Sequence, residues 1–253
     1  MTDPHLNLFY TYNQDNQLIE NNLTRAFIIT TRFLSEPSRD ILWNSLIAER
    51  VGSTLIGNSL KSISLENAEF ALQDNMDRDI SRSSLNKFIV SISSYRYEVP
   101  DDIQVTIYTS KPDGWIYDQS GTYCFLVESK IGDNPISNPQ IISHALKWLE
   151  IPQTKLTEHL ISLTWNDVVG GVQNLLISTI SSESPGLSYQ ERSLLNDFKD
   201  YMKLYGYGKY SGLSFDGLVN APSLHIMEQE KSIDYRLTLN GLADSPKLLL
   251  NIR

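Results

Sequence analysis

Apolar side chains recur at helical intervals in several separate stretches of this chain. In an α-helix, residues at i, i+3, i+4 and i+7 share one face, so this spacing predicts helices with one buried side. The pattern is clear around Leu23 and Phe27 and again after Asn138, which can cap a helix whose first residue is Pro139. The predicted helices cover residues 16–34, 39–51, 139–150, 166–180 and 189–206.

Shorter apolar runs, several of them β-branched and alternating with polar residues, predict strands. These runs lie within residues 60–74, 87–93, 123–128, 159–165, 225–240 and 247–253. From residue 16 to residue 180 the order is helix, an insertion, strand, strand, helix, strand, helix. Alternation of this kind favours an α/β domain in which helices cover a mixed sheet.

The predicted organisation is one domain with an appended segment. Residues 1–206 form the domain, with an insertion around 35–105, and residues 207–253 form a strand-rich C-terminal extension of the same domain. A chain of 253 residues is long enough for this arrangement.

Composition narrows the class of protein. No apolar run approaches the roughly 20 residues that span a bilayer, and the N-terminus has no secretory signal pattern, so we expect a cytoplasmic protein without a membrane partner.

The single cysteine, Cys124, excludes an internal disulfide and a multi-cysteine zinc site. A net charge of −9 argues against a protein that coats nucleic acid, although a local basic strip or a partner subunit can still supply phosphate contacts.

The segment KPDGWIYDQSGTYCFLVESKIGD carries the candidate chemistry. A short hairpin through residues 119–121 would bring Asp113 beside Glu128. Alternate residues of a strand share a face, so Glu128 and Lys130 should point the same way while Ser129 points inward. Two carboxylates can hold a hard divalent cation, and an adjacent ammonium can contact the water or phosphate that the cation activates. The pattern predicts hydrolysis of a phosphodiester.

Other interpretations of these residues remain open at this point. Pro-Asp-Gly is also a strong turn signal, and a Glu-x-Lys triplet can be an ordinary surface ion pair. Paired carboxylates also serve glycosidases, but a lysine two residues from the acid has no required part in that chemistry.

Both motifs resemble those of the PD-(D/E)xK nuclease superfamily, which includes many restriction and DNA-repair nucleases. Pro112-Asp113 matches the first motif and Glu128-Ser129-Lys130 matches the second, and the resemblance covers roughly residues 18–180. It implies a restriction-endonuclease-like αβββαβ core with the motifs on a central hairpin. It also implies a metal-dependent nuclease, with DNA a better substrate than RNA, serving in restriction or antiphage defence.

The resemblance further assigns roles to individual residues. Asp113, Glu128 and the carbonyl of Ser129 would bind Mg²⁺, for which Mn²⁺ would substitute, and Lys130 would act on the attacking water. Many members carry a carboxylate on the first helix, and Glu20 stands in that place as a further metal ligand.

On the helix after the hairpin, some members carry Gln-x-x-x-Tyr. Gln140 fits the glutamine, as a residue that orients phosphate or water, whereas His144 stands at the tyrosine position. Two interpretations of His144 are kept: it contacts the site, or it is a packed histidine of the helix.

The resemblance also implies partners, either a second copy of the chain or another subunit of a larger defence complex. The alternative function is a catalytically silent nuclease-fold subunit that binds nucleic acid or assists assembly.

One further segment, KDYMKLYGYGKY, interleaves lysines with tyrosines. Such a mixture can bind a nucleic-acid backbone and stack on bases. Tyrosines on a helix also commonly pack at its edge, and both interpretations are kept here.

Overall fold

The structure is a computed structural model that describes residue 9 and residues 19–47, 64–73, 77–100, 111–178, 186–208, 234–237 and 248–251. The chain forms two compact units, Met1–Lys209 and Tyr210–Arg253. In the second unit β6 (Asp234–Leu237) pairs antiparallel with β7 (Leu248–Asn251). Everything that follows concerns the first unit.

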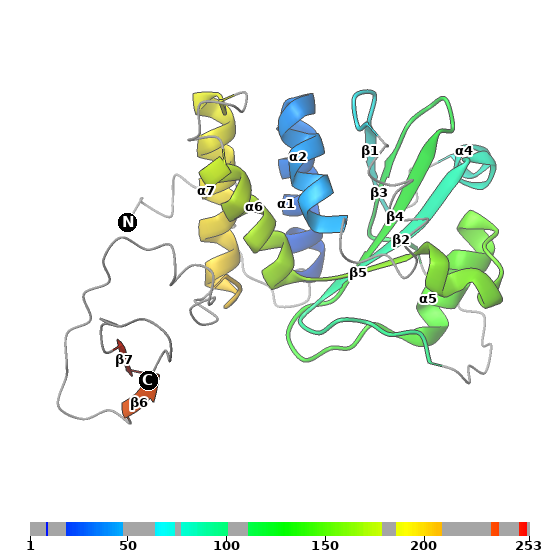
Figure 1. The fold of residues 1–253 in the computed structure, drawn as a ribbon. Coiled ribbons are helices and arrows are strands. Elements are labelled where there is room, and N and C mark those ends of the chain that lie inside the picture. Colours follow the sequence, from blue (N-terminus) through cyan, green and yellow to red (C-terminus); the bar gives the residue numbers. More distant parts are fainter. Residues whose placement is uncertain are drawn as a thin grey trace. The chain divides into compact units, whose positions relative to one another are not determined.

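A five-stranded mixed sheet forms the centre of this unit (Figure 1). Its order is β1 (Glu69–Leu72), β3 (Gly114–Tyr117), β4 (Tyr123–Ser129), β2 (Asn86–Ser93) and β5 (Leu160–Thr164). β3 runs antiparallel to β1 and β4, whereas β2 runs parallel to β4 and β5. The α/β class with a mixed sheet flanked by helices is therefore confirmed.

The strand at the centre of the parallel half, β2, comes from residues 35–105, the stretch predicted to be an insertion. β2 pairs with β4 along Asn86–Ile92 and with β5 along Ile89–Ser93. Its residues from Phe88 onward are buried. This stretch also supplies β1 and the helices α2 (Glu36–Ile47) and α4 (Arg78–Ser83).

Five of the described α-helices overlap predicted stretches, whereas α4 was not predicted and one predicted stretch is divided. The described α-helices are α1 (Ile19–Phe33), α2 (Glu36–Ile47), α4 (Arg78–Ser83), α5 (Asn138–His144), α6 (Trp165–Ser178) and α7 (Tyr189–Leu204). The stretch 139–150 is not one α-helix, because α5 continues as a π-helical turn over Ala145–Leu149, and a 3₁₀ helix follows at Gln153–His159. The N-cap of α5 is Ser137, one residue before the predicted cap. None of the described helices is long and apolar enough to cross a membrane.

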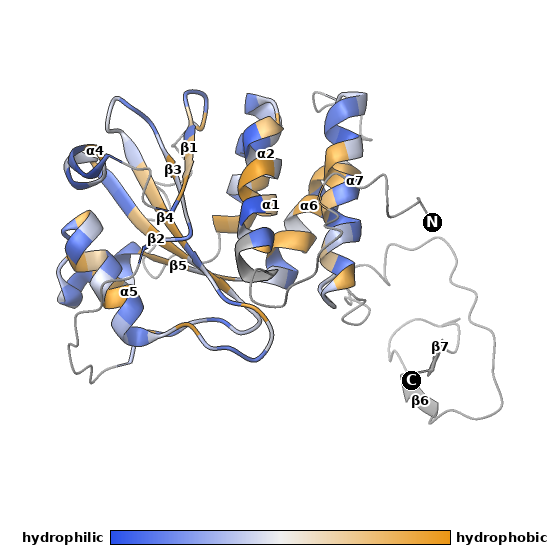
Figure 2. Cartoon of the chain, turned by 180° about the vertical axis from the view of Figure 1, so that it is seen from behind, coloured by the Kyte–Doolittle hydropathy of each residue, from blue (hydrophilic) through white to orange (hydrophobic). Residues whose placement is uncertain are grey.

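Both faces of the sheet are covered. One face packs on α1, α2, α6 and α7, and its part of β4 comprises Tyr123, Phe125 and Val127. The other face packs on α5 and the π-helical turn, through Cys124 and Leu126 of the same strand. Figure 2 shows α6 as largely hydrophobic, as expected of a helix that packs in the interior. Because β4 is buried on both faces, its successive residues enter two different cores.

Arg39 of α2 fixes the end of α1. Its buried guanidinium donates to the carbonyls of Thr31, Arg32, Leu34 and Leu65, at 2.7 to 3.2 Å. The last carbonyls of a helix have no partner within the helix, and a cation at that end also opposes the helix dipole. The corner between α1 and α2 is thereby held in place.

Glu191 ties the beginning of α7 to that corner. Its carboxylate accepts hydrogen bonds from the hydroxyl and backbone N–H of Ser188, within a capping box, and from the same two groups of Ser35. Burial alone would raise the pKa of Glu191, but these four hydrogen bonds lower it from 4.5 to about 2. The carboxylate is thus held in its charged form.

Glu191→Gln should therefore destabilise the fold in a pH-dependent way. The folded-state pKa of Glu191 is depressed, so its contribution is present above pH 4.5 and is lost as the pH falls through about 2. We expect a loss of about 2 kcal/mol in the free energy of unfolding at pH 7 that shrinks toward pH 3, measured by chemical denaturation. Glu158→Gln, at an exposed position, is the control and should show no such trend. An equal loss at both pH values would contradict the assignment.

Two adjacent glycines of α6 have different surroundings. A Cβ at Gly171 would lie 2.8 Å from Cδ2 of Leu46 and 3.1 Å from Oγ of Ser45, whereas a Cβ at Gly170 meets nothing within 4 Å. Gly171 therefore allows α6 to approach α2 closely.

Gly170→Ala and Gly171→Ala should change stability in opposite directions. Alanine at position 170 should raise the free energy of unfolding by about 0.4–1 kcal/mol, because it restricts the unfolded chain and favours the helix. Alanine at position 171 overpacks the contact with the buried Leu46 and should lower it by about 1–3 kcal/mol. Thermal and urea unfolding would measure both, and a stabilising Gly171→Ala would refute the close approach.

Candidate functional site

Three consecutive residues at the end of β4 point alternately to the two sides of the sheet. Glu128 and Lys130 lie on the side of α5, and their side chains contact one another. Ser129 lies on the side of α1, where its hydroxyl hydrogen-bonds to that of Thr24. The alternation predicted from the sequence is present.

The carboxylate of Glu128 is fully buried and receives three donors. Its Oε1 accepts from Nζ of Lys130 at 2.8 Å and from Nε2 of Gln140 at 2.5 Å. Its Oε2 lies 3.0 Å from Nε2 of His144. A buried carboxylate without such partners would be strongly destabilising, so these donors are what allow Glu128 to stand inside the fold.

The ammonium of Lys130 contacts a carboxylate oxygen and a backbone carbonyl oxygen. Nζ lies 2.8 Å from Oε1 of Glu128 and 2.9 Å from the carbonyl oxygen of Ser129. The backbone of Lys130 is fixed at both ends, because its N–H donates to the carbonyl of Ile92 on β2 and its carbonyl accepts from Nε1 of Trp165 on α6, each at 2.8 Å. The lysine is therefore held by two neighbouring elements.

Asp113 precedes β3 by one residue and turns toward Ser129. Its Oδ2 accepts from the backbone N–H of Ser129 at 2.8 Å and lies 3.3 Å from its hydroxyl oxygen. The N–H of Asp113 donates to the carbonyl of Val127, although Val127 is the register partner of Gly114. Two consecutive residues thus meet one residue of β4, as in a β-bulge, a feature that redirects side chains.

Gln140 and His144 come from α5, one helical turn apart. At this spacing both side chains lie on one face of the helix, and here both contact the carboxylate of Glu128. Pro139 lies within the first two helical positions, where its missing N–H costs no hydrogen bond. The structure therefore brings Gln140 and His144 together with Glu128.

Glu20 is the one predicted ligand whose side chain lies outside the described part. Its backbone is in the first turn of α1, four residues before Thr24, whose hydroxyl contacts Ser129. Among the described residues there is no cluster of three or more His, Cys, Asp or Glu side chains arranged to hold a metal ion. The described groups that could bind a metal ion are the carboxylates of Asp113 and Glu128 and the carbonyl of Ser129.

This donor set suits Mg²⁺, which takes oxygen ligands and is commonly bound by one or two carboxylates together with waters and substrate phosphates. Asp113 contacts the N–H of Ser129, and Glu128 and the Ser129 carbonyl both contact the same ammonium. Nζ of Lys130 lies beside Oε1 of Glu128 and the carbonyl oxygen of Ser129, so this end of β4 accommodates a positive charge next to two of the predicted ligand oxygens.

Several residues that support the site were not singled out from the sequence. Thr24 contacts Ser129 from α1, and Ile92 and Trp165 hold the backbone of Lys130. The only available signal was the position of Thr24, four residues after Glu20 on a predicted helix. Contacts of this kind depend on strand order and helix placement, which spacing in the sequence does not specify.

The lysine- and tyrosine-rich segment is used for packing where the structure describes it. Tyr201 and Tyr207 are buried, and the hydroxyl of Tyr207 accepts from the N–H of Gly132 at 3.0 Å and lies 3.1 Å from Oγ of Ser94. Lys203 pairs with Asp200 at 2.8 Å. Through its hydroxyl, Tyr207 fixes a loop next to the site, and neither Tyr201 nor Tyr207 forms an exposed stacking surface.

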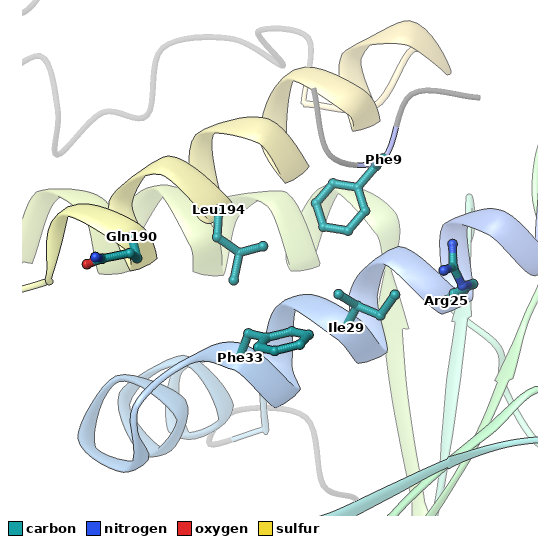
Figure 3. A pocket seen from close by; sticks show the side chains of 6 residues that line it. All are labelled: Phe9, Arg25, Ile29, Phe33, Gln190 and Leu194. Carbon is teal, nitrogen blue, oxygen red and sulfur yellow. The ribbon is translucent and has the colours of Figure 1, made fainter. Parts of the chain in front are cut away.

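A cavity of about 380 Å³ lies between α1 and α7 (Figure 3). Its lining is mainly apolar, with the polar ends of Arg25 and Gln190, and the residues are Phe9, Arg25, Ile29, Phe33, Gln190 and Leu194. It contains none of the predicted site residues.

Lys130→Met should destabilise the fold, because it leaves the buried carboxylate of Glu128 without its ammonium partner. Lys130 is 17% exposed and Glu128 is 0% exposed, so we expect a loss of about 3 kcal/mol in the free energy of unfolding. Lys203→Met is a matched control, since its ion pair has the same 2.8 Å distance but lies at the surface, and it should cost under about 1 kcal/mol. Equal effects of the two substitutions, measured by urea unfolding, would argue against the buried pair.

Comparison of the chain with protein-family models, with curated proteins and with solved structures finds no match.

Proposed function

We propose that this chain is a metal-dependent nuclease that hydrolyses phosphodiester bonds of DNA, with Mg²⁺ as its cation and Mn²⁺ as a substitute. The observation that carries the proposal is the position of the Lys130 ammonium, between Oε1 of Glu128 and the carbonyl of Ser129. Asp113 reaches the N–H of the same serine. Two acids, a carbonyl and a lysine thus share one strand end.

The chemistry is attack of water on phosphorus with cleavage of a P–O bond. Asp113, Glu128 and the Ser129 carbonyl would hold the cation, which neutralises phosphate charge and lowers the pKa of a bound water. Lys130 would orient that water or donate to a phosphate oxygen as negative charge develops. Gln140 fixes Oε1 of Glu128 and is placed to orient a water beside it.

The edge of the sheet offers a contact for phosphate despite the net charge of −9. β2, β4 and β5 run parallel, so their carboxyl ends meet at the edge that carries the site. In open α/β sheets ligands commonly bind at this edge. Arg96 follows β2 here, with its side chain 52% exposed and 3.5 Å from Asp167. A backbone phosphate could take the place of this weak pair.

A second candidate function is a catalytically silent nuclease-fold subunit that binds nucleic acid or assists assembly. The burial of Glu128 favours it, because the carboxylate is 0% exposed and has donors on both of its oxygens. A closed network of this kind is also what a purely structural role would need.

Cleavage of supercoiled plasmid and of single-stranded DNA tests the proposal. Wild-type protein should cut in Mg²⁺ or Mn²⁺ and not in EDTA, and Asp113→Ala and Lys130→Ala should each lose at least about 100-fold in rate. Lys203→Ala, which removes a surface lysine with an ion pair of the same length, should cut at the wild-type rate. Circular dichroism would establish that each variant is folded.

The other outcomes of these experiments distinguish the nuclease from the catalytically silent subunit. Wild-type cutting by Lys130→Ala would refute the proposed site. If the wild type does not cut, Mn²⁺ titration by calorimetry decides. Binding that is lost in Asp113→Ala indicates a nuclease that needs a partner subunit, such as one in a restriction or antiphage complex. No binding indicates the silent subunit.

A further inference from the structure

The two oxygens of Glu128 have different partners. Oε1 contacts Lys130 and Gln140, and the ammonium of Lys130 also contacts the Ser129 carbonyl. Oε2 lies 3.0 Å from Nε2 of His144. The imidazole and the carboxylate are both fully buried.

His144 is set up as a hydrogen-bond donor to Oε2. An ionised carboxylate only accepts, so Nε2 must carry the proton of this hydrogen bond. Within the described part of the chain, Nδ1 of His144 is buried and has no hydrogen-bond partner. Among the described residues Nε2 is therefore the one ring nitrogen with a hydrogen-bond partner, so the ring is held through its contact with Glu128.

The helix that carries His144 changes its geometry at this residue. α5 ends at His144, and the π-helical turn Ala145–Leu149 begins directly after it. Such turns inside helices occur often at functional sites. His144 is therefore the last α-helical residue before the irregular turn, one turn beyond Gln140.

We propose that His144 is a positioning residue for the cation site, and the proposal rests on the proposed function. The terminal torsion of a glutamate side chain is soft, so hydrogen bonds decide which way the carboxylate faces. His144 holds Oε2, and this contact leaves Oε1, which lies beside the ammonium of Lys130, as a ligand. Partners that orient metal ligands in this way typically change metal affinity by about 10–100-fold when they are removed.

The test is the affinity of the folded protein for Mn²⁺, measured by calorimetry and by loss of the free-ion electron paramagnetic resonance signal. His144→Leu fills the space without a donor and should weaken Mn²⁺ binding by about 10–100-fold. His144→Gln places an amide N–H near the position of Nε2 and should bind within about threefold of wild type, since a donor to the carboxylate remains. Ile141→Val, in the apolar core on the same helix, controls for general loosening and should bind as wild type does.

If His144→Leu does not fold, His144→Asn replaces it, because its shorter amide is polar but does not reach the position of Nε2. Loss of affinity in the leucine or asparagine variant with retention in glutamine supports the proposal. Wild-type affinity in all variants overturns it, and so does an equal loss in His144→Gln. Absence of Mn²⁺ binding by the wild type overturns the proposed function as well, and the two failures are thereby distinguished.

Discussion

The buried carboxylate of Glu128 is the constraint on which the site depends. A negative charge at this depth requires donors, and the fold supplies them from its own strand and from α5. The position of α5 against the sheet is therefore set partly by polar contacts and not only by the apolar residues around Ile141. Whatever the carboxylate does chemically, the packing of this helix and the orientation of Glu128 are determined together.

The surroundings of Lys130 show how rigid elements fix a functional group. Its N–H bonds to a parallel neighbour, β2, and its carbonyl bonds to the first residue of α6. Tyr207, three residues after the end of α7, holds the loop that follows Lys130 through the N–H of Gly132. Because each contact comes from a different element, the backbone around the lysine is held in place by the fold itself.

The sequence predicts local features well and long-range pairing poorly. The alternation at Glu128-Ser129-Lys130 follows from the period of a strand, whereas Gln140 is assigned to the site only through the resemblance to a nuclease family. The contact of Thr24 with Ser129 and the bulge at Asp113 do not follow from such a period, because they depend on how α1 and β3 meet β4. The role of His144 also needed the structure, since a histidine on a buried helical face fits packing and hydrogen bonding equally. The metal, the reaction and the substrate stay proposals drawn from the site.

The place of β2 has a consequence for how the chain can be divided. The segment from residue 111 to residue 178 contains both motifs, α5 and β5. Yet β4 and β5 do not pair with each other in the sheet and are joined only through β2. A fragment starting after residue 105 would retain the motif residues but leave two buried parallel strands with unpaired backbone groups on facing edges. A fragment that keeps this sheet continuous must therefore include β2, the strand that precedes the motifs.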